Sequence, residues 1–189
     1  MKVLGIAGSP RRGGNTDLLL TEVLRGAQSK GAEVKTIILC DLDIAPCQHC
    51  DACLKSGDCQ FNDDMQLIYR ELVDSDRIVL ASPLFFTGVT AQMKAMIDRC
   101  QALWVRKHKL NMPPLGDRRE RKGLFVSVGG RQTASFQPAI ATVKAFFSSL
   151  DISYSGELVF SGVDDKGAIT GHPDALRQAY LVGQKLVAD

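Results

Sequence analysis

Residues 2–16 read KVLGIAGSPRRGGNT, a short apolar run that leads into a loop of glycines and small polar residues. The run 2–7 predicts a β-strand, and apolar residues then recur at helical spacing from Leu18 to Ala27. The chain therefore opens with a strand, a tight loop and a helix. In a parallel sheet such a loop lies at the carboxyl end of its strand, where ligands bind.

The alternation of strand and helix continues along the chain. Strands are predicted at 33–39, 77–82, 123–128 and 152–160, and helices at 63–73, at 89–104, around 140–150 and from Pro173, a favourable first-turn residue. Because the strands are almost continuously apolar, we expect a parallel sheet with helices on both faces. Neither a repeat nor a linker interrupts the pattern, so residues 1–189 are predicted to form a single α/β domain.

One long irregular stretch is expected at 106–122, RKHKLNMPPLGDRRERK, which contains seven Lys or Arg residues. A charge run of this kind is typical of a solvated loop. The alternative is a surface that binds a phosphorylated dinucleotide or a neighbouring subunit.

Composition and charge exclude several classes of protein. A content of 45% apolar and 23% charged residues is ordinary for a globular domain. A net charge of +2, with one tryptophan and three tyrosines, excludes nucleic acid as the main partner. No apolar run is long enough to span a membrane and the first ten residues do not form a signal peptide, so we expect no membrane association and a cytoplasmic location.

Four of the six cysteines lie in CQHCDACLKSGDC, residues 47–59. The spacing CxxCxxCxxxxxC predicts a metal centre in a reducing compartment, with Cys47, Cys50, Cys53 and Cys59 as ligands. Structural zinc usually takes two well-separated pairs, whereas overlapping CxxCxxC is typical of iron–sulfur ligation, so one [4Fe-4S] cluster is favoured over zinc. A disulfide or inert thiols are the remaining alternatives. His49 is expected to face solvent, and no function is expected for Cys40 or Cys100.

Three loops should converge at the carboxyl edge of the sheet, at 8–16, 82–90 and 127–132. The first suits a phosphate, because small residues expose backbone N–H groups at a helix start, but it matches neither the Walker A sequence nor GxGxxG. The second carries Phe85 and Phe86; one of them is expected to turn into the core, and the other to be exposed and covered by a flat apolar ring such as a flavin. The third ends in glycines, which let the backbone approach a ring edge.

Three segments together resemble the flavodoxin-like NAD(P)H-dependent FMN reductases, and within them the iron–sulfur flavoproteins. The segments are GSPR..GNT, SPLFFTGVTAQMKAMIDR and CxxCxxCxxxxxC. The resemblance implies a flavodoxin-like three-layer sandwich with sheet order 2-1-3-4-5 and a cysteine-rich insertion at about 46–60, after the second strand. It implies a homodimer or homotetramer in which the cluster of one subunit lies near the FMN of another. It further implies an FMN phosphate site at Ser9, Pro10, Arg11, Gly14, Asn15 and Thr16, and a ring site at Pro83, Leu84, Phe85, Phe86, Thr87, Gly88, Gly129 and Gly130.

FMN and a [4Fe-4S] cluster together would convert between two-electron and one-electron transfer. This chemistry requires no general base from the protein, and we predict no catalytic side chain. The electron donor is expected to be NAD(P)H or ferredoxin. The alternatives are an NAD(P)H-dependent reductase of flavin, quinones or azo compounds whose cysteine loop holds no cluster, and a non-catalytic carrier or partner-binding module with structural zinc.

The cysteine segment is also acidic. Lys55 is the only basic residue that accompanies six aspartates, at positions 41, 43, 51, 58, 63 and 64. We expect this negative charge to make a cluster harder to reduce and to favour contact with the basic residues 106–122 of a second subunit.

Overall fold

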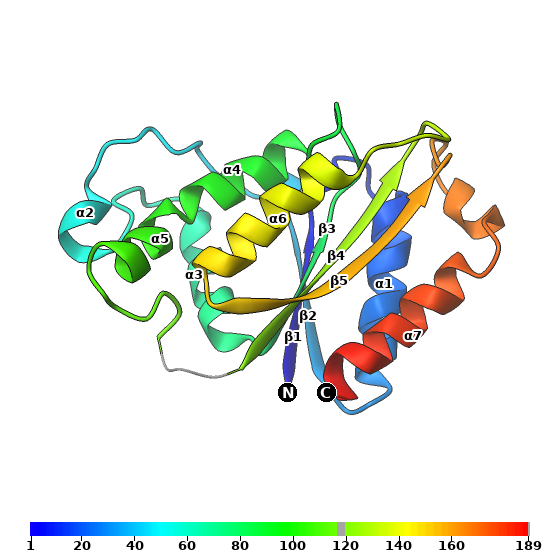
Figure 1. Ribbon diagram of the computed structural model, residues 1–189, viewed down its shortest axis with the longest axis horizontal. Helices are drawn as coiled ribbons and strands as arrows, with labels where there is room; N and C mark the ends of the chain where they lie inside the picture. Colours follow the sequence, from blue (N-terminus) through cyan, green and yellow to red (C-terminus); the bar gives the residue numbers. More distant parts are fainter. Residues whose placement is uncertain (117–119, 189) are drawn as a thin grey trace.

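The computed structural model describes residues 1–116 and 120–188. Five parallel strands form one sheet in the order β2-β1-β3-β4-β5 (Figure 1). The strands are β1 (Lys2–Ala7), β2 (Glu33–Ile38), β3 (Arg77–Ala81), β4 (Arg121–Gly129) and β5 (Ile152–Ser161). The predicted fold class and strand order are confirmed.

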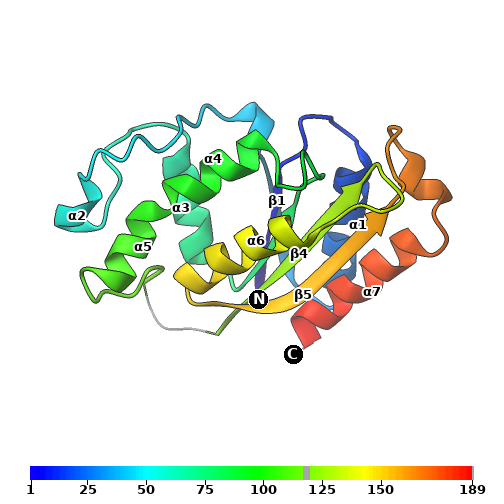
Figure 2. The ribbon, with the colours of Figure 1, turned by 45° about the horizontal axis from the view of Figure 1, so that its top comes forward.

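Helices cover both faces of the sheet, which makes three layers (Figures 1 and 2). One face packs against α1 (Asn15–Gln28) and α7 (Ala175–Ala188). The other packs against α3 (Met65–Asp74), α4 (Ala91–Arg99), α5 (Gln101–His108) and α6 (Gln137–Ser149). Three short elements complete the chain, namely η1 (Leu39–Asp41), α2 (Cys53–Ser56) and η2 (Ala168–Gly171).

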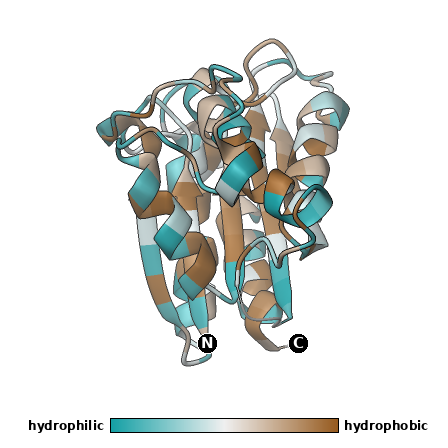
Figure 3. Cartoon of the chain, turned by 90° about the vertical axis from the view of Figure 1, so that its left-hand side faces the viewer, coloured by the Kyte–Doolittle hydropathy of each residue, from teal (hydrophilic) through white to brown (hydrophobic). Residues whose placement is uncertain are grey.

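Alternation of side chains along each strand divides the apolar residues between the two faces. In β1, Leu4 and Ile6 join the core under α3 to α6, whereas Val3 and Ala7 join the core under α1 and α7. Both faces are buried, so β1 has no polar side chain from Val3 to Ala7, rather than one at every second position. Figure 3 shows this as hydrophobic colour that runs along the strands, whereas the helices carry both kinds of residue.

Two glycines let α1 and α7 approach each other. A Cβ added to Gly183 of α7 would lie 1.9 Å from the carbonyl oxygen of Val23, and one added to Gly26 of α1 would lie 2.0 Å from that of Tyr180. Any larger residue at either position would force the two helices apart.

Some predicted boundaries differ from the structure. The helix predicted at 89–104 is two helices, α4 and α5, that join at Cys100. Pro173 lies in a turn two residues before α7, so it is not the first helical residue as predicted. Among the described residues no helix is both long enough and apolar enough to cross a membrane.

The prediction of one irregular, solvated stretch at 106–122 is wrong at both ends. Arg106 and the two residues after it complete α5, and Arg121 begins β4. Arg121 is buried and donates hydrogen bonds to the carbonyl oxygens of Val73, Ser75 and Leu115. Arg118 and Arg119 lie outside the described residues.

Candidate functional site

The predicted loops gather at the carboxyl edge of the sheet, which Figure 2 turns toward the viewer. They enclose a cleft between the loops after β1, β3, β4 and β5. Most of the predicted FMN-binding residues line it, namely Ser9, Pro10, Arg11, Gly14, Asn15, Thr16, Pro83, Leu84, Phe85 and Gly130. The structure thus brings the phosphate residues and part of the ring residues together, and their binding of FMN stays a prediction.

The first loop presents the start of α1 to the cleft. Gly14 is the N-cap residue and has no side chain with which to cap the helix, so the first turn of α1 offers N–H groups and the partial positive charge of the helix, which suit an anion. The Ser9 hydroxyl accepts from the Arg11 N–H at 3.1 Å and fixes the turn. Asp17 accepts from the Gly13 N–H at 2.9 Å, and burial raises the pKa of this carboxyl above its ordinary value.

The loop after β5 closes the cleft from a side that the sequence did not indicate. Arg11 donates to the carbonyl oxygen of Asp164 at 3.2 Å. The Asn15 side chain donates to the carbonyl oxygen of Asp165 at 2.8 Å and accepts from the Ile169 N–H at 3.2 Å. Asn15 therefore holds this loop against α1, and its side chain is less available to a phosphate than its position in the motif suggested.

Lys166, on the same loop, also lines the cleft and adds a cation close to the phosphate loop. It was not among the predicted residues, although the run GVDDKG at 162–167 follows a predicted strand. The position of Lys166 directly after a predicted strand could have indicated that it lines the cleft.

A buried hydroxyl network fixes the loop after β3. The Thr90 hydroxyl donates to the Gly8 carbonyl oxygen at 2.6 Å and caps α4 by accepting from Met93 N–H. Ser82 accepts from Thr90 N–H at 3.0 Å, and its carbonyl oxygen accepts from the Ser127 hydroxyl at 2.7 Å. The loops after β1 and β3 are therefore joined to each other and to the end of β4 by direct hydrogen bonds.

The tip of this loop is a tight reversal between Phe85 and Gly88, which exchange backbone hydrogen bonds of 3.0 Å in both directions. Phe86 and Thr87 adopt positive φ angles of 50° and 66°, which are unfavourable for an aromatic and a β-branched residue. Phe86 is fully exposed and Phe85 is half exposed, so the expectation that one of them turns into the core is wrong. The tight reversal points both rings away from the sheet. Two exposed aromatic rings on a strained turn are suited to covering a flat ligand.

The glycines after β4 are needed by the protein itself. A Cβ on Gly129 would lie 2.6 Å from that of Ala134, and one on Gly130 would lie 3.0 Å from the Asp164 carboxylate. Of the predicted ring residues, Phe86, Thr87, Gly88 and Gly129 are not among those that line the cleft.

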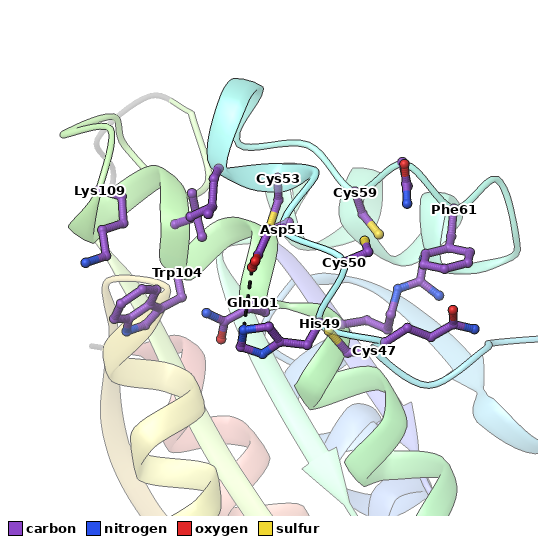
Figure 4. A pocket seen from close by; sticks show the side chains of 16 residues that line it. Cys47, His49, Cys50, Asp51, Cys53, Cys59, Phe61, Gln101, Trp104 and Lys109 are labelled. Carbon is purple, nitrogen blue, oxygen red and sulfur yellow. Dashed lines mark ion pairs between the residues drawn. The ribbon is translucent and has the colours of Figure 1, made fainter.

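The four motif cysteines surround a second cavity, of about 340 Å³, between the loop after β2 and the helices α4 and α5 (Figure 4). Their thiols are free, and Cys53 begins the single-turn helix α2, which ends at Gly57 with a positive φ of 76°. His49 is mostly exposed and lies 3.5 Å from Asp51 at the edge of the cavity, as expected of a solvent-facing side chain. Cys40 and Cys100 do not line it.

The thiols of the motif are gathered around this cavity but do not form a ready-made site. Among residues 1–116 and 120–188, no group of three His, Cys, Asp or Glu side chains is arranged to hold a metal ion. Burial raises the pKa of the Cys53 thiol, and the neighbouring Cys47, Cys50 and Cys59 raise it further. A thiol of this kind would lose its proton to a bound metal.

The cysteine loop is fixed at its base and at its tip. At the base, Asp64 accepts from Asp43 N–H at 2.8 Å and Asp63 accepts from Ala45 N–H at 3.1 Å. At the tip, Arg106 of α5 donates to the carbonyl oxygen of Gly57 at 3.0 Å and pairs with Asp58. The cavity is thus bounded by a braced loop.

Arg99, the last residue of α4, is buried beneath this loop. It forms two hydrogen bonds with the Asp63 carboxylate, donates to the Ala45 carbonyl oxygen at 2.8 Å and stacks on Phe61. Although burial alone would lower it, the pKa of Arg99 is raised by the hydrogen bond with Asp63 and by the nearby Cys59 and Asp63 charges. The guanidinium stays charged at the cavity wall.

These pairs change the expected electrostatics of the loop. Three of the six aspartates pair with arginines from other parts of the same chain: Asp41 with Arg12, Asp58 with Arg106 and Asp63 with Arg99. The negative charge is therefore partly neutralised, and one contact between the loop and segment 106–122 is made within one subunit.

The chain was compared with known proteins. Residues 1–164 match the family model for NADPH-dependent FMN reductase. An iron–sulfur flavoprotein of Archaeoglobus fulgidus is 37% identical over 145 residues, which are 77% of this chain and 70% of the relative. An iron–sulfur flavoprotein of Methanosarcina thermophila is 30% identical over 189 residues, which are 100% of this chain and 91% of the relative.

The chain belongs to the NADPH-dependent FMN reductase family and, within it, to the iron–sulfur flavoproteins. It is therefore an FMN-dependent oxidoreductase. Among solved structures, a flavone reductase is similar with a TM-score of 0.73 and 22% identity, over 100% of this chain and 62% of that one, which shows the shared fold.

Both sites fit the groups that the iron–sulfur flavoprotein family implies. The cleft offers a helix N-terminus, hydroxyls and cations at one end and Leu84 with Phe85 at the other, as a phosphate and an apolar ring require. The braced cavity offers four thiols. Among the described residues the two linings share no member, and the cysteine loop projects beside α5, away from α7 (Figures 1 and 2).

Proposed function

We propose that this chain transfers electrons between FMN, held in the cleft at the sheet edge, and a [4Fe-4S] cluster, held by Cys47, Cys50, Cys53 and Cys59. The observation that carries the proposal is that all four cysteines of the motif line one cavity. FMN exchanges electrons in pairs or singly, and a cluster exchanges them singly.

In this proposal the residues of the chain bind, orient and shield. Arg11, Lys166 and the first turn of α1 hold the phosphate, and the Thr90 network keeps the loops in register around it. Phe85 and Phe86 cover the ring and exclude water. Within the described residues no side chain is assigned to proton transfer.

The proposal includes transfer between subunits. The cleft and the cysteine cavity have no lining residue in common, and in a homodimer or homotetramer the cluster of one subunit would lie near the FMN of another. Electrons would enter from NAD(P)H or from ferredoxin. We propose the cytoplasm as the location, because a reducing compartment keeps the six cysteines as thiols.

Anaerobic purification followed by iron, sulfide, zinc and flavin assays tests the proposal. We expect a brown protein with about four irons and one FMN per chain. Yellow protein that contains FMN but no iron would instead support a reductase without a cluster. Colourless protein that contains zinc would support a carrier or binding module. Either result would overturn the proposal.

A further inference from the structure

One polar group in the wall of the cysteine cavity lacks a partner. The side chain of Arg99 is 1% exposed, and its Nε has no hydrogen-bond partner among the residues that the structure describes. The other two guanidinium nitrogens donate hydrogen bonds: Nη1 and Nη2 donate to the Asp63 carboxylate, and Nη1 also donates to the Ala45 carbonyl oxygen. A buried N–H without an acceptor is destabilising because it has lost its hydrogen bond to water, and the ion pair with Asp63 does not require that loss.

The cysteine sulfurs of the cavity are candidate acceptors for the Arg99 Nε–H. Arg99 lines the cavity together with the motif cysteines, and Cys59 is close enough for its charge to act on the guanidinium. The Tyr69 hydroxyl, which also lies beside Cys59, donates to the Arg99 carbonyl oxygen at 2.6 Å. Arg99 Nε is therefore a buried donor without a partner, on a guanidinium that already interacts with the Cys59 side chain.

We propose that Arg99 donates its Nε–H to the sulfur of the cluster at the Cys59 corner and thereby raises the reduction potential of the cluster. This inference rests on the proposed function, since it requires a cluster in the cavity. Asp63 offsets part of the guanidinium charge and fixes its plane, so the hydrogen bond is the main contribution.

The sign follows from charge. Uptake of one electron makes the cluster one unit more negative, and a hydrogen-bond donor stabilises the more negative state. Loss of the donor should therefore make the cluster harder to reduce. Arg99 is in this sense the counterpart of the surrounding aspartates, which act in the opposite direction.

Reductive titration with dithionite and mediator dyes, followed by EPR of the reduced cluster, measures the effect in the cluster-loaded protein. At a fixed solution potential we expect Arg99→Gln to lower the ratio of reduced to oxidised cluster about tenfold, which is about 59 mV for a one-electron couple. Arg99→Lys keeps a positive charge beside Asp63 but loses Nε. The reduction potential of its cluster should lie between those of the unmutated protein and of Arg99→Gln.

Arg106→Gln is the matched control. Arg106 also pairs with an aspartate of the cysteine loop, but it does not line the cavity, so the same loss of charge should shift the potential less. An Arg99→Gln variant that keeps its iron and its potential, or one that shifts no more than Arg106→Gln, would overturn the inference.

If Arg99→Gln does not bind a cluster, the hydrogen bond from Arg99 can still be tested in the unmutated protein. With ¹⁵N-arginine incorporated, pulsed EPR of the reduced cluster should detect coupling to one nearby ¹⁵N, and Arg99→Lys should abolish it wherever a cluster forms. Absence of the coupling in an iron-loaded protein refutes the role of Arg99 alone. Absence of iron from the unmutated protein refutes the proposed function as well.

Discussion

The carboxylate of Asp63 and the guanidinium of Arg99 meet edge to edge, with Oδ2 2.5 Å from Nη1 and Oδ1 3.0 Å from Nη2. The pair joins the base of the cysteine loop to the end of α4, and the Arg99 side chain is almost wholly buried. Burial would raise the pKa of Asp63, but the hydrogen bonds from Arg99, Ala45 and Met65 outweigh it and lower that pKa.

Asp63→Asn should destabilise the protein in a pH-dependent way. At neutral pH the loss of the partner of a buried arginine should cost on the order of 3 kcal/mol. Because the folded pKa is below the unfolded value of about 3.9, this advantage is present above that value and is lost as pH falls through the folded pKa.

Urea unfolding of the iron-depleted chain at several pH values between about 7 and 3 measures this difference between the unmutated protein and Asp63→Asn. Asp64→Asn is the control, since Asp64 caps one backbone N–H and has no arginine partner among the described contacts. A difference that stays constant with pH would contradict the assignment.

Cys53→Ser should remove the cluster and leave the flavin. Cys53 lines the cavity and is half-buried there, whereas the FMN cleft has none of its residues in common with that cavity. Iron per chain should fall by most of its value while flavin absorbance per chain is unchanged. Cys40→Ser, at an exposed thiol outside the cavity, should retain both, and full iron in Cys53→Ser would be evidence against this ligand set.

Arg11→Ala should weaken FMN binding at least tenfold. A hydrogen bond to a charged group contributes about 1.5–3 kcal/mol, and 1.4 kcal/mol is a factor of ten. Quenching of FMN fluorescence measures the affinity. Arg12→Ala removes the same charge from the next residue, but Arg12 pairs with Asp41 and does not line the cleft. Equal losses in the two variants would indicate only a general charge effect.

Gly183→Ala should destabilise the protein although alanine favours helices. Helix propensity alone predicts a gain of about 1 kcal/mol. The new Cβ would lie 1.9 Å from the carbonyl oxygen of Val23, so we expect a net loss of about 1–3 kcal/mol, seen as a lower Tm by circular dichroism. Gly171→Ala, whose Cβ would meet nothing within 4 Å, should leave Tm almost unchanged, and a raised Tm for Gly183→Ala would disprove the close packing.

Periodicity alone predicted the sheet and the existence of most helices, because strands buried on both faces leave an apolar run that polar loops interrupt. It did not predict the break at Cys100, where apolar residues continue at helical spacing on both sides and the backbone of one residue leaves the helical region. Local sequence carries the spacing of side chains but not a change of helix direction, which tertiary packing decides.

The cleft and the cysteine cavity were predictable from the glycine-rich loops and the closely spaced cysteines. Single residues that come from distant parts of the sequence were less predictable. An arginine in the last turn of a helix is ordinarily explained by the helix dipole. That Arg99 turns inward depends on Asp63, 36 positions earlier in the chain, which no local pattern connects to it. Lys166 was missed for a similar reason, since its loop becomes part of the cleft only once β5 lies beside β4.

The glycine contact between α1 and α7 also bears on the order of folding during synthesis. Helix α1 is among the first segments to leave the ribosome, yet the helix that covers it begins only at Ala175. Until that point the nascent chain carries an unshielded surface along α1 around Val23 and Gly26, where α7 will pack. A chaperone that binds exposed apolar helices would have its longest opportunity there, and a chain arrested before α7 would remain its client.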